Sequence, residues 1–233
     1  MSSQFVSQIM TKGEPPHIVV CNNEKPVKTP KGNILMSPSK ELARYVCTEL
    51  KACLEDKTTP GAALKLHNTY LDRSEDDILL WQNLCMEQLR SDAIWIREPY
   101  PEALCKEQDA LFAPFEHVAS QRFGYLPQPS QSLLFPAINK DVEQGVKKFL
   151  IDLTPIGLLA FLGLVQRCQS FILPYGHIYG SISWEGIRDA LFVEENWQRR
   201  YWGEDKEALA RQAHLTEDLS YYCTLTRLAQ QAS

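Results

Sequence analysis

The sequence predicts an α+β fold, with a small N-terminal domain at residues 1–72 and a larger C-terminal domain at residues 73–233. The first domain is expected to be antiparallel and β-rich with one helix, because short apolar runs alternate there with turn-forming residues. The second is expected to be an orthogonal α-helical bundle, because apolar residues recur at three- and four-residue spacing from Ser74 onward. A chain of 233 residues has ample surface to bury in this arrangement.

Three short strands are predicted near the N-terminus. They cover residues 17–21, 25–29 and 34–36, and turn-forming residues separate them. Pro26 and Pro30 place the middle strand at an edge, because proline has no N–H to donate to a neighbouring strand. A helix follows Ser37, and its apolar side is expected to pack against this sheet.

The C-terminal helices begin and end at residues with the usual capping chemistry. Ser74 precedes an acidic first turn, and Gly124 stops the next long helix. Thr154 and Pro155 open the most apolar helix. Its apolar run at 156–165 is too short to cross a bilayer, which needs about 20 residues, so no membrane insertion is expected. The last helices are expected at 184–202, capped by Ser181 or Ser183, and at 209–228.

Composition argues against a nucleic-acid partner. The net charge is −5, and no cluster of lysine and arginine is long enough to follow a phosphate backbone. An acidic chain can still bind a protein partner through local basic or apolar patches.

The cysteines and histidines give no sign of a metal site. The seven cysteines and five histidines are dispersed without metal-ligand spacing, so neither a metal nor a cofactor is expected. An odd, dispersed set of cysteines fits free thiols in a reducing compartment. The N-terminus has neither the layout of a secretory signal nor the arginine content of a mitochondrial presequence. The expected localisation is a bacterial cytoplasm, or the mitochondrial matrix if the protein is eukaryotic.

Catalytic signatures are absent from the sequence, so no catalytic residue is expected. GxSxG, GxxxxGK[ST] and GxGxxG do not occur. One alternative is a Mg²⁺-dependent helical enzyme, because the acidic run at 72–77 could hold Mg²⁺ through carboxylates. That enzyme would use Asp72, Asp76, Asp77 and Glu194, and Mg²⁺ would raise its stability against heat. Stabilisation of a helix start explains the acidic run more simply.

The most informative segment is 194–205, which reads EENWQRRYWGED. On one continuous helix over 184–202, Glu194 falls in the middle of an apolar stripe that includes Ile187 and Trp197. A carboxylate there is costly unless something pairs with it. On residue types alone, pairing with Arg188 or Arg167 in a helix-packing network is favoured over a functional site.

The same segment resembles the signature of the F-type ATP synthase assembly chaperones, the family that binds the alpha subunit of the F1 sector. That family carries an acidic triplet, then an aromatic residue and glutamine, then Trp-Gly. The corresponding residues here are Glu194, Glu195, Asn196, Trp197, Gln198, Trp202 and Gly203. Asn196 stands in place of the third acid. KPVKTP at 25–30 is similar to the family's RPVKTP stretch, and the resemblance continues in order over residues 18–215.

The resemblance implies a non-catalytic, ATP-independent chaperone, a monomer when free. Its partner would be the unassembled F1 alpha subunit, held from aggregation until it joins the beta subunit. The client-binding residues implied are Glu195, Glu194, Trp197, Gln198, Trp202, Lys25 and Lys28. Glu195 is the residue expected to be critical, in contact with an arginine or backbone amides. Trp197 and Trp202 are expected to pack against the helix or the client, and the effect of Asn196 on client binding is open.

Overall fold

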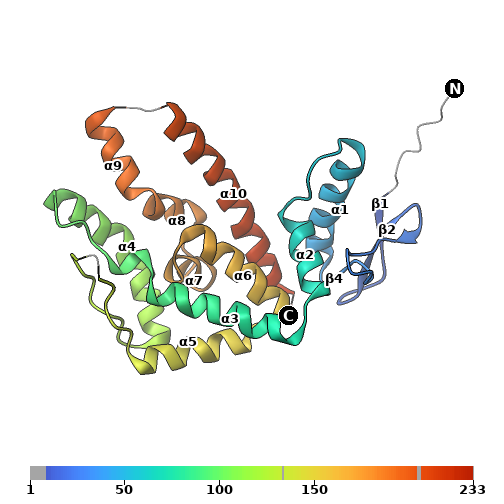
Figure 1. Cartoon of the computed structure of the whole chain (residues 1–233), viewed down its shortest axis with the longest axis horizontal. Helices are drawn as coiled ribbons and strands as arrows, with labels where there is room; N and C mark the ends of the chain where they lie inside the picture. Colours follow the sequence, from blue (N-terminus) through green and yellow to red (C-terminus); the bar gives the residue numbers. More distant parts are fainter. Residues whose placement is uncertain (1–8, 133, 204–205, 233) are drawn as a thin grey trace.

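The computed structural model describes residues 9–132, 134–203 and 206–232 and confirms the α+β fold class. An antiparallel sheet of four strands lies at one end of the molecule, and helices form the rest (Figure 1). The described residues contain no helix both long and apolar enough to span a membrane.

The sheet is built around its second strand. The strands are β1 (Ile9–Lys12), β2 (Ile18–Asn22), β3 (Lys25–Pro26) and β4 (Met36–Ser37). β2 pairs antiparallel with each of the other three, and β3 lies at an edge as the prolines predict. The sequence pattern does not predict β1, and it makes β3 and β4 too long. Val27 and Leu35 still donate backbone hydrogen bonds to Val20 and Val27, so the chain stays paired outside the regular strands.

The predicted helices occur in the predicted order, with further helices between them. They are α1 (Lys40–Glu55), α2 (Ala62–Asp72), α3 (Glu75–Arg90), the 3₁₀ helix η1 (Ala93–Trp95), α4 (Glu102–Phe123), α5 (Lys140–Asp152), α6 (Pro155–Cys168), α7 (Ile172–Tyr179), α8 (Trp184–Leu191), α9 (Val193–Trp202) and α10 (Lys206–Gln231). The predicted caps are confirmed. Ser74 forms a capping box with Asp77, and Thr154 accepts the Gly157 N–H at 3.3 Å. Gly124, at φ 84°, ends α4.

A small hydrophobic core joins the sheet to the helices. It contains Val20 and Leu35 from the sheet segment and Leu42 and Val46 from α1, which confirms the predicted packing face. It also contains four residues from the C-terminal half: Ile156 and Ala160 of α6, and Leu225 and Ala229 of α10. The predicted boundary between residues 72 and 73 falls in the link from α2 to α3, and this core has members on both sides of it. That boundary stays a prediction.

Inside this small core, His67 of α2 is fully buried and makes two hydrogen bonds. Its Nδ1 donates to the Ala63 carbonyl at 2.8 Å, which leaves Nε2 to accept from the Ser37 hydroxyl at 3.0 Å. Burial lowers the pKa of His67 to about 4, with the hydrogen bond to Ala63 opposing that shift. The imidazole therefore holds α2 to the sheet in its neutral form.

His67 is expected to make the protein less stable in mild acid. Its folded pKa of about 4 lies below the ordinary value of 6.5, so between these pH values the unfolded chain binds a proton that the folded protein does not. Stability from this group is present above pH 6.5 and lost as the pH falls toward 4. His67→Gln should flatten the pH dependence of the unfolding free energy across that window by about 2–3 kcal/mol. Urea denaturation of both proteins at pH 7 and pH 4.5 measures this, and parallel pH curves would contradict it.

The larger core is centred on α6 and a cluster of aromatic rings. Phe149 packs edge-on against Phe161, Phe171 and Tyr175 with ring centroids 5.2–6.1 Å apart. Edge-to-face contacts of this kind stabilise a core beyond the area they bury. Among the surrounding helices, α4 contacts both α8 and α9.

The segment 184–202 is two helices, so the predicted single helix is wrong. α8 ends at Leu191 and α9 begins at Val193. Phe192 between them has φ −101° and ψ 17° and is almost fully buried. The apolar stripe therefore does not run on from Ile187 through Glu194. Glu194 and Glu195 instead fall in the first turn of α9, where carboxylates are favoured by the helix dipole.

Candidate functional site

Polar contacts with α10 fix one side of α9. Glu195 accepts a hydrogen bond from Arg211 at 3.2 Å, and both side chains are partly exposed. The side-chain oxygen of Asn196 accepts from Arg199 at 3.0 Å and from Gln212 at 3.1 Å. The residue in place of the third acid thus has a structural role, because its carbonyl oxygen ties α9 to α10.

Glu194 pairs with a glutamine and not with an arginine. Gln108 of α4 donates from Nε2 to Glu194 Oε1 at 2.9 Å. Pairing of Glu194 with Arg188 or Arg167 is therefore wrong, since Arg188 contacts Asp189 and Arg167 contacts Asp218. The side chain lies at the surface, but the carboxylate sits against protein. That partial burial, with Glu98 nearby, raises the pKa of Glu194.

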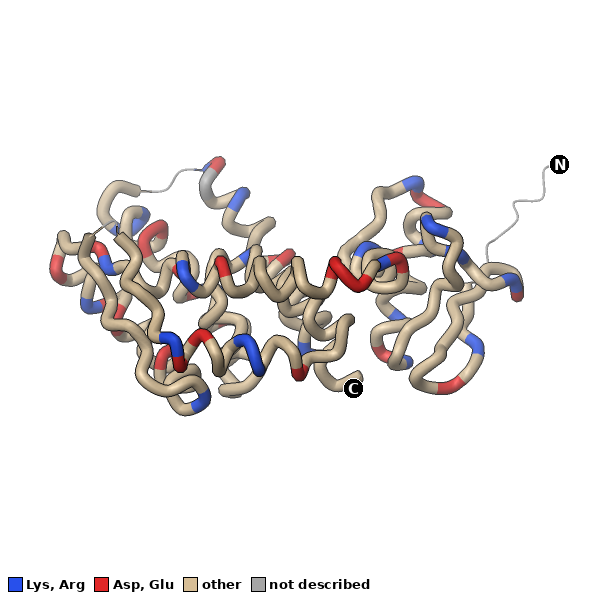
Figure 2. The backbone as a smooth tube through the Cα atoms, turned by 60° about the horizontal axis from the view of Figure 1, so that its bottom comes forward, with Lys and Arg blue, Asp and Glu red and all other residues tan. Residues whose placement is uncertain are grey.

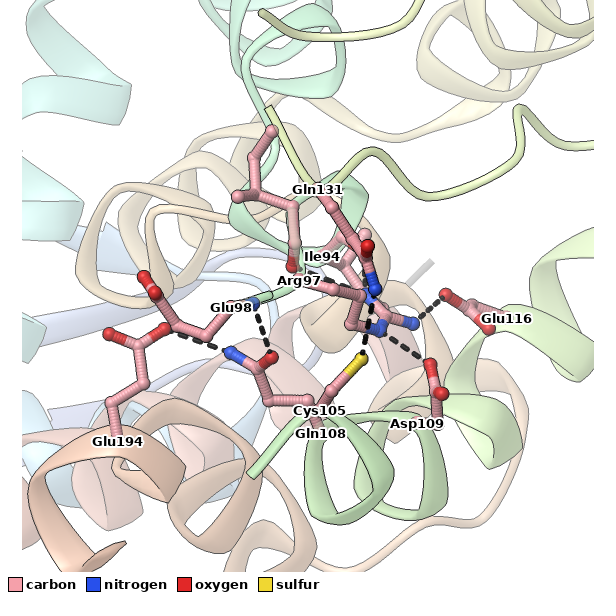
Figure 3. Close-up of polar contacts among 10 residues, drawn as sticks. Ile94, Arg97, Glu98, Cys105, Gln108, Asp109, Glu116, Gln131 and Glu194 are labelled. Atoms are coloured by element: carbon pink, nitrogen blue, oxygen red, sulfur yellow. Dashed lines mark hydrogen bonds and ion pairs between the residues drawn. The ribbon is translucent and has the colours of Figure 1, made fainter. Parts of the chain in front are cut away.

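A buried polar network beneath Glu194 sets its position (Figure 3). Gln108 is 2% exposed, and its Oε1 accepts the backbone N–H of Glu98 at 2.8 Å. The neighbouring Arg97 is 3% exposed and pairs with Asp109 at 2.7 Å and with Glu116 at 2.8 Å. The network therefore joins the segment before α4, α4 itself and the first turn of α9.

Beside this network lies a surface depression that we term the aromatic groove. Its volume is about 510 Å³, and it is lined by Glu98, Tyr100, Pro101, Ala103, Leu104, Glu194, Trp197, Gln198, Tyr201 and Trp202. Tyr100 is 85% exposed and Trp202 is 80% exposed. Trp197 contacts Tyr201 at 4.8 Å between ring centroids, which fixes one wall. Large aromatic side chains held in water beside fixed carboxylates are features of a protein-binding surface.

The structure brings together most of the predicted site residues. Glu194, Trp197, Gln198 and Trp202 line the aromatic groove, and Glu195 lies next to it on α9. Lys25 in β3 and Lys28 just after it are exposed at the opposite end of the molecule, where the sheet lies in Figure 1. Client contact by any of these residues stays a prediction.

The groove also contains residues that were not predicted. Tyr100 and Leu104 supply apolar surface, and Glu98 supplies a second carboxylate. Glu98, Leu104 and Gln108 all lie in a stretch that resembles the chaperone family, so the sequence carried a signal for them. It gave no sign that Gln108 contacts α9, which lies 86 residues further along the chain.

The acidic run at 72–77 has structural roles in this protein. Asp72 accepts from Thr29 at 2.5 Å and from Asn33 at 2.8 Å, and Asp77 caps α3 through Ser74. Glu194 lies on α9, and α2 lies on the other side of α10 from it (Figure 1), so the four residues of the enzyme alternative do not meet. Among the described residues no group of three His, Cys, Asp or Glu is placed to hold a metal ion.

Charge is distributed in a mixed pattern over the molecule. Figure 2 shows lysine and arginine interspersed with aspartate and glutamate at both ends. Recognition on such a surface depends on local groups, of which the aromatic groove with its carboxylates is an example.

Comparison with known proteins finds a similarity to one family. The family model described as ATP12 chaperone protein matches residues 6–120. Over these residues the chain is similar to the ATP12 chaperone family. This confirms the family expected from the sequence motifs. Among curated proteins, no sequence matches the chain.

Solved structures share the fold over almost the whole chain. Atp12 from Paracoccus denitrificans is 21% identical, with a TM-score of 0.80 over 96% of this chain and 98% of that one. A mutant form of that protein is equally similar, at 21% identity and a TM-score of 0.81, over 96% of this chain and 97% of the mutant. The Atu1473 protein of Agrobacterium tumefaciens is 23% identical, with a TM-score of 0.84 over 97% of this chain and 85% of that one. The shared fold includes the helical region that carries α9, outside the family-model match.

Proposed function

We propose that this protein is an assembly chaperone for the F1 sector of ATP synthase that binds the unassembled alpha subunit. The match to the ATP12 family model and the similarity to Atp12 support the chaperone role. The aromatic groove beside Glu194 and Glu195 is the observation that supports a client surface on α9. Binding keeps the alpha subunit from aggregating until it joins the beta subunit.

The physical basis is the covering of an apolar client interface. Trp202, Tyr201 and Tyr100 present large, rigid, exposed rings, which give contact area at little cost in conformational entropy. Carboxylates at the edge set register and suppress wrong partners more than they add raw affinity. This division of roles needs neither ATP nor a cofactor.

We place the protein in a reducing compartment, a bacterial cytoplasm or the mitochondrial matrix, and as a monomer when free. The seven cysteines are free thiols, and four of them are buried. Buried thiols are protected from oxidation by their surroundings. Fractionation of the source cells and sedimentation of the purified protein test the two statements.

Aggregation of purified F1 alpha subunit, followed by light scattering without ATP, tests the function. The wild-type protein should suppress scattering at a near-stoichiometric ratio, and Glu195→Gln should lose most of that protection. Glu87→Gln, which removes an exposed carboxylate on α3, is the matched control and should protect like the wild type.

A second variant separates client contact from support of α9. Arg211→Gln removes the ion pair of Glu195 but keeps its carboxylate, so it should retain protection. If Arg211→Gln fails as badly as Glu195→Gln, the role of Glu195 is structural. No suppression by excess wild-type protein would refute the proposed function itself.

A further inference from the structure

Two carboxylates lie side by side at one end of the aromatic groove. Glu98 comes from the segment before α4 and Glu194 from the first turn of α9, and their side chains point toward one another (Figure 3). Their like charges interact, and this contributes to the raised pKa of Glu194. Gln108 holds the pair together, because it binds the Glu98 backbone through one side-chain atom and the Glu194 carboxylate through the other.

The cations near this pair are already engaged elsewhere. Arg97 pairs with Asp109 and Glu116, Arg200 with Glu107, and Arg211 with Glu195. Within the described part of the chain, neither Glu98 nor Glu194 takes part in an ion pair. The protein therefore fixes two neighbouring negative charges at the surface without supplying a positive charge between them.

The surroundings of the pair are aromatic. Tyr100 and Trp202 are the most exposed rings of the groove, and Trp197 and Leu104 form its more buried wall. Burial of an apolar side chain against these rings is favourable, because it removes apolar surface from water. A cation over the face of a tryptophan or tyrosine is attracted by the ring as well as by a carboxylate. The negative charges and the aromatic rings therefore both favour a ligand that carries a cation next to apolar groups.

We propose that the aromatic groove receives an apolar segment of the client that carries an arginine or lysine, whose charged end lies between Glu98 and Glu194. The cation neutralises the repulsion between the two carboxylates, while its neighbours pack on Tyr100 and Trp202. The assignment of this segment to the F1 alpha subunit rests on the proposed function. The chemistry of the groove can be tested without it.

Two short peptides test the chemistry directly. Acetyl-Leu-Phe-Arg-Leu-amide carries the cation, and the same peptide with citrulline in place of arginine is its neutral isostere. Quenching of tryptophan fluorescence should show the arginine peptide binding several-fold more tightly to the wild-type protein. The double variant Glu98→Gln with Glu194→Gln should bind both peptides equally. Equal binding to the wild type, or no binding of either peptide, overturns the proposal.

Binding of purified F1 alpha subunit then links the groove to the client. The double variant should bind roughly tenfold more weakly than the wild type. Glu102→Gln, an exposed carboxylate at the start of α4, removes a nearby charge outside the groove and should leave affinity unchanged. The Glu194→Gln substitution keeps a side-chain oxygen for the Gln108 N–H, so the double variant should fold, and its thermal midpoint checks this. If the wild-type protein prefers the arginine peptide but does not bind the alpha subunit, only the proposed function is refuted. If the double variant binds the alpha subunit as tightly as the wild type, the groove is not the client site.

Discussion

Asp92→Ala is expected to lower the free energy of unfolding by about 3–5 kcal/mol, the largest effect of any substitution considered. Asp92 is fully buried between η1 and the start of α7. Its Oδ1 accepts the Ile94 N–H at 3.1 Å, and its Oδ2 accepts the N–H groups of Phe171 and Ile172 at 2.7 and 3.0 Å. Alanine leaves three buried backbone donors without an acceptor, each costing about 1–3 kcal/mol before the structure relaxes.

Urea denaturation measures this loss, with two further variants as references. Asp92→Asn keeps the shape of the side chain but places an amide N–H against backbone N–H donors. Its free energy of unfolding is therefore expected to lie between those of the wild type and Asp92→Ala. Asp152→Ala, at the exposed end of α5, should change stability by less than about 0.5 kcal/mol. A loss below about 1 kcal/mol in Asp92→Ala would mean that water or a backbone shift satisfies the donors.

The pH dependence of Asp92 has the opposite sign to that of His67. Burial raises the pKa of Asp92 to about 6, although hydrogen bonds from Ile172, Ser170, Ile94 and Phe171 oppose this. Between the ordinary value of 3.8 and about 6, the folded protein holds a proton that the unfolded chain releases. The stabilising contribution is present below pH 3.8 and lost as the pH rises through about 6. The stability difference between wild type and Asp92→Asn should therefore be larger at pH 4 than at pH 7.

Local chemistry explains why most helices could be predicted from the sequence. Ser74, Thr154 and Gly124 cap or end helices through contacts within a few residues of themselves, so their roles can be read from the sequence. The break at Phe192 could not be read in this way. It occurs at a buried ring, and burial is decided by tertiary packing, whereas a helical wheel assumes that no such break occurs.

The candidate site was predictable in part for the same reason. The α9 signature placed Trp197 and Trp202, which lie on one short helix. The partner of Glu194 was not predictable, because Gln108 meets it through tertiary packing. The similarity of KPVKTP to a family stretch also gives no information about distances in the folded protein. It could not show that the sheet, which carries Lys25, lies at the far end of the molecule from α9.

Arg97→Met is expected to lower the free energy of unfolding by about 2–4 kcal/mol and to loosen the aromatic groove. The guanidinium is buried, donates to the Ile94 carbonyl and lies over the Phe112 ring at 4.7 Å. Its carboxylate partners Asp109 and Glu116 are partly exposed, so water recovers some of the loss when the charge is removed.

The conservative variant shows how the arginine acts on the groove. Arg97→Lys keeps the charge but cannot reach both carboxylates and the carbonyl at once, so an intermediate loss of stability is expected. Binding of the arginine peptide should weaken in the same order, because Arg97 fixes the segment from which Glu98 and Tyr100 reach the groove. Denaturation and peptide titration of the three proteins measure both effects. If Arg97→Met is as stable as the wild type, Arg97 does not support this part of the fold. If Arg97→Met is less stable but binds the arginine peptide with unchanged affinity, α4 and α9 alone hold the groove in shape.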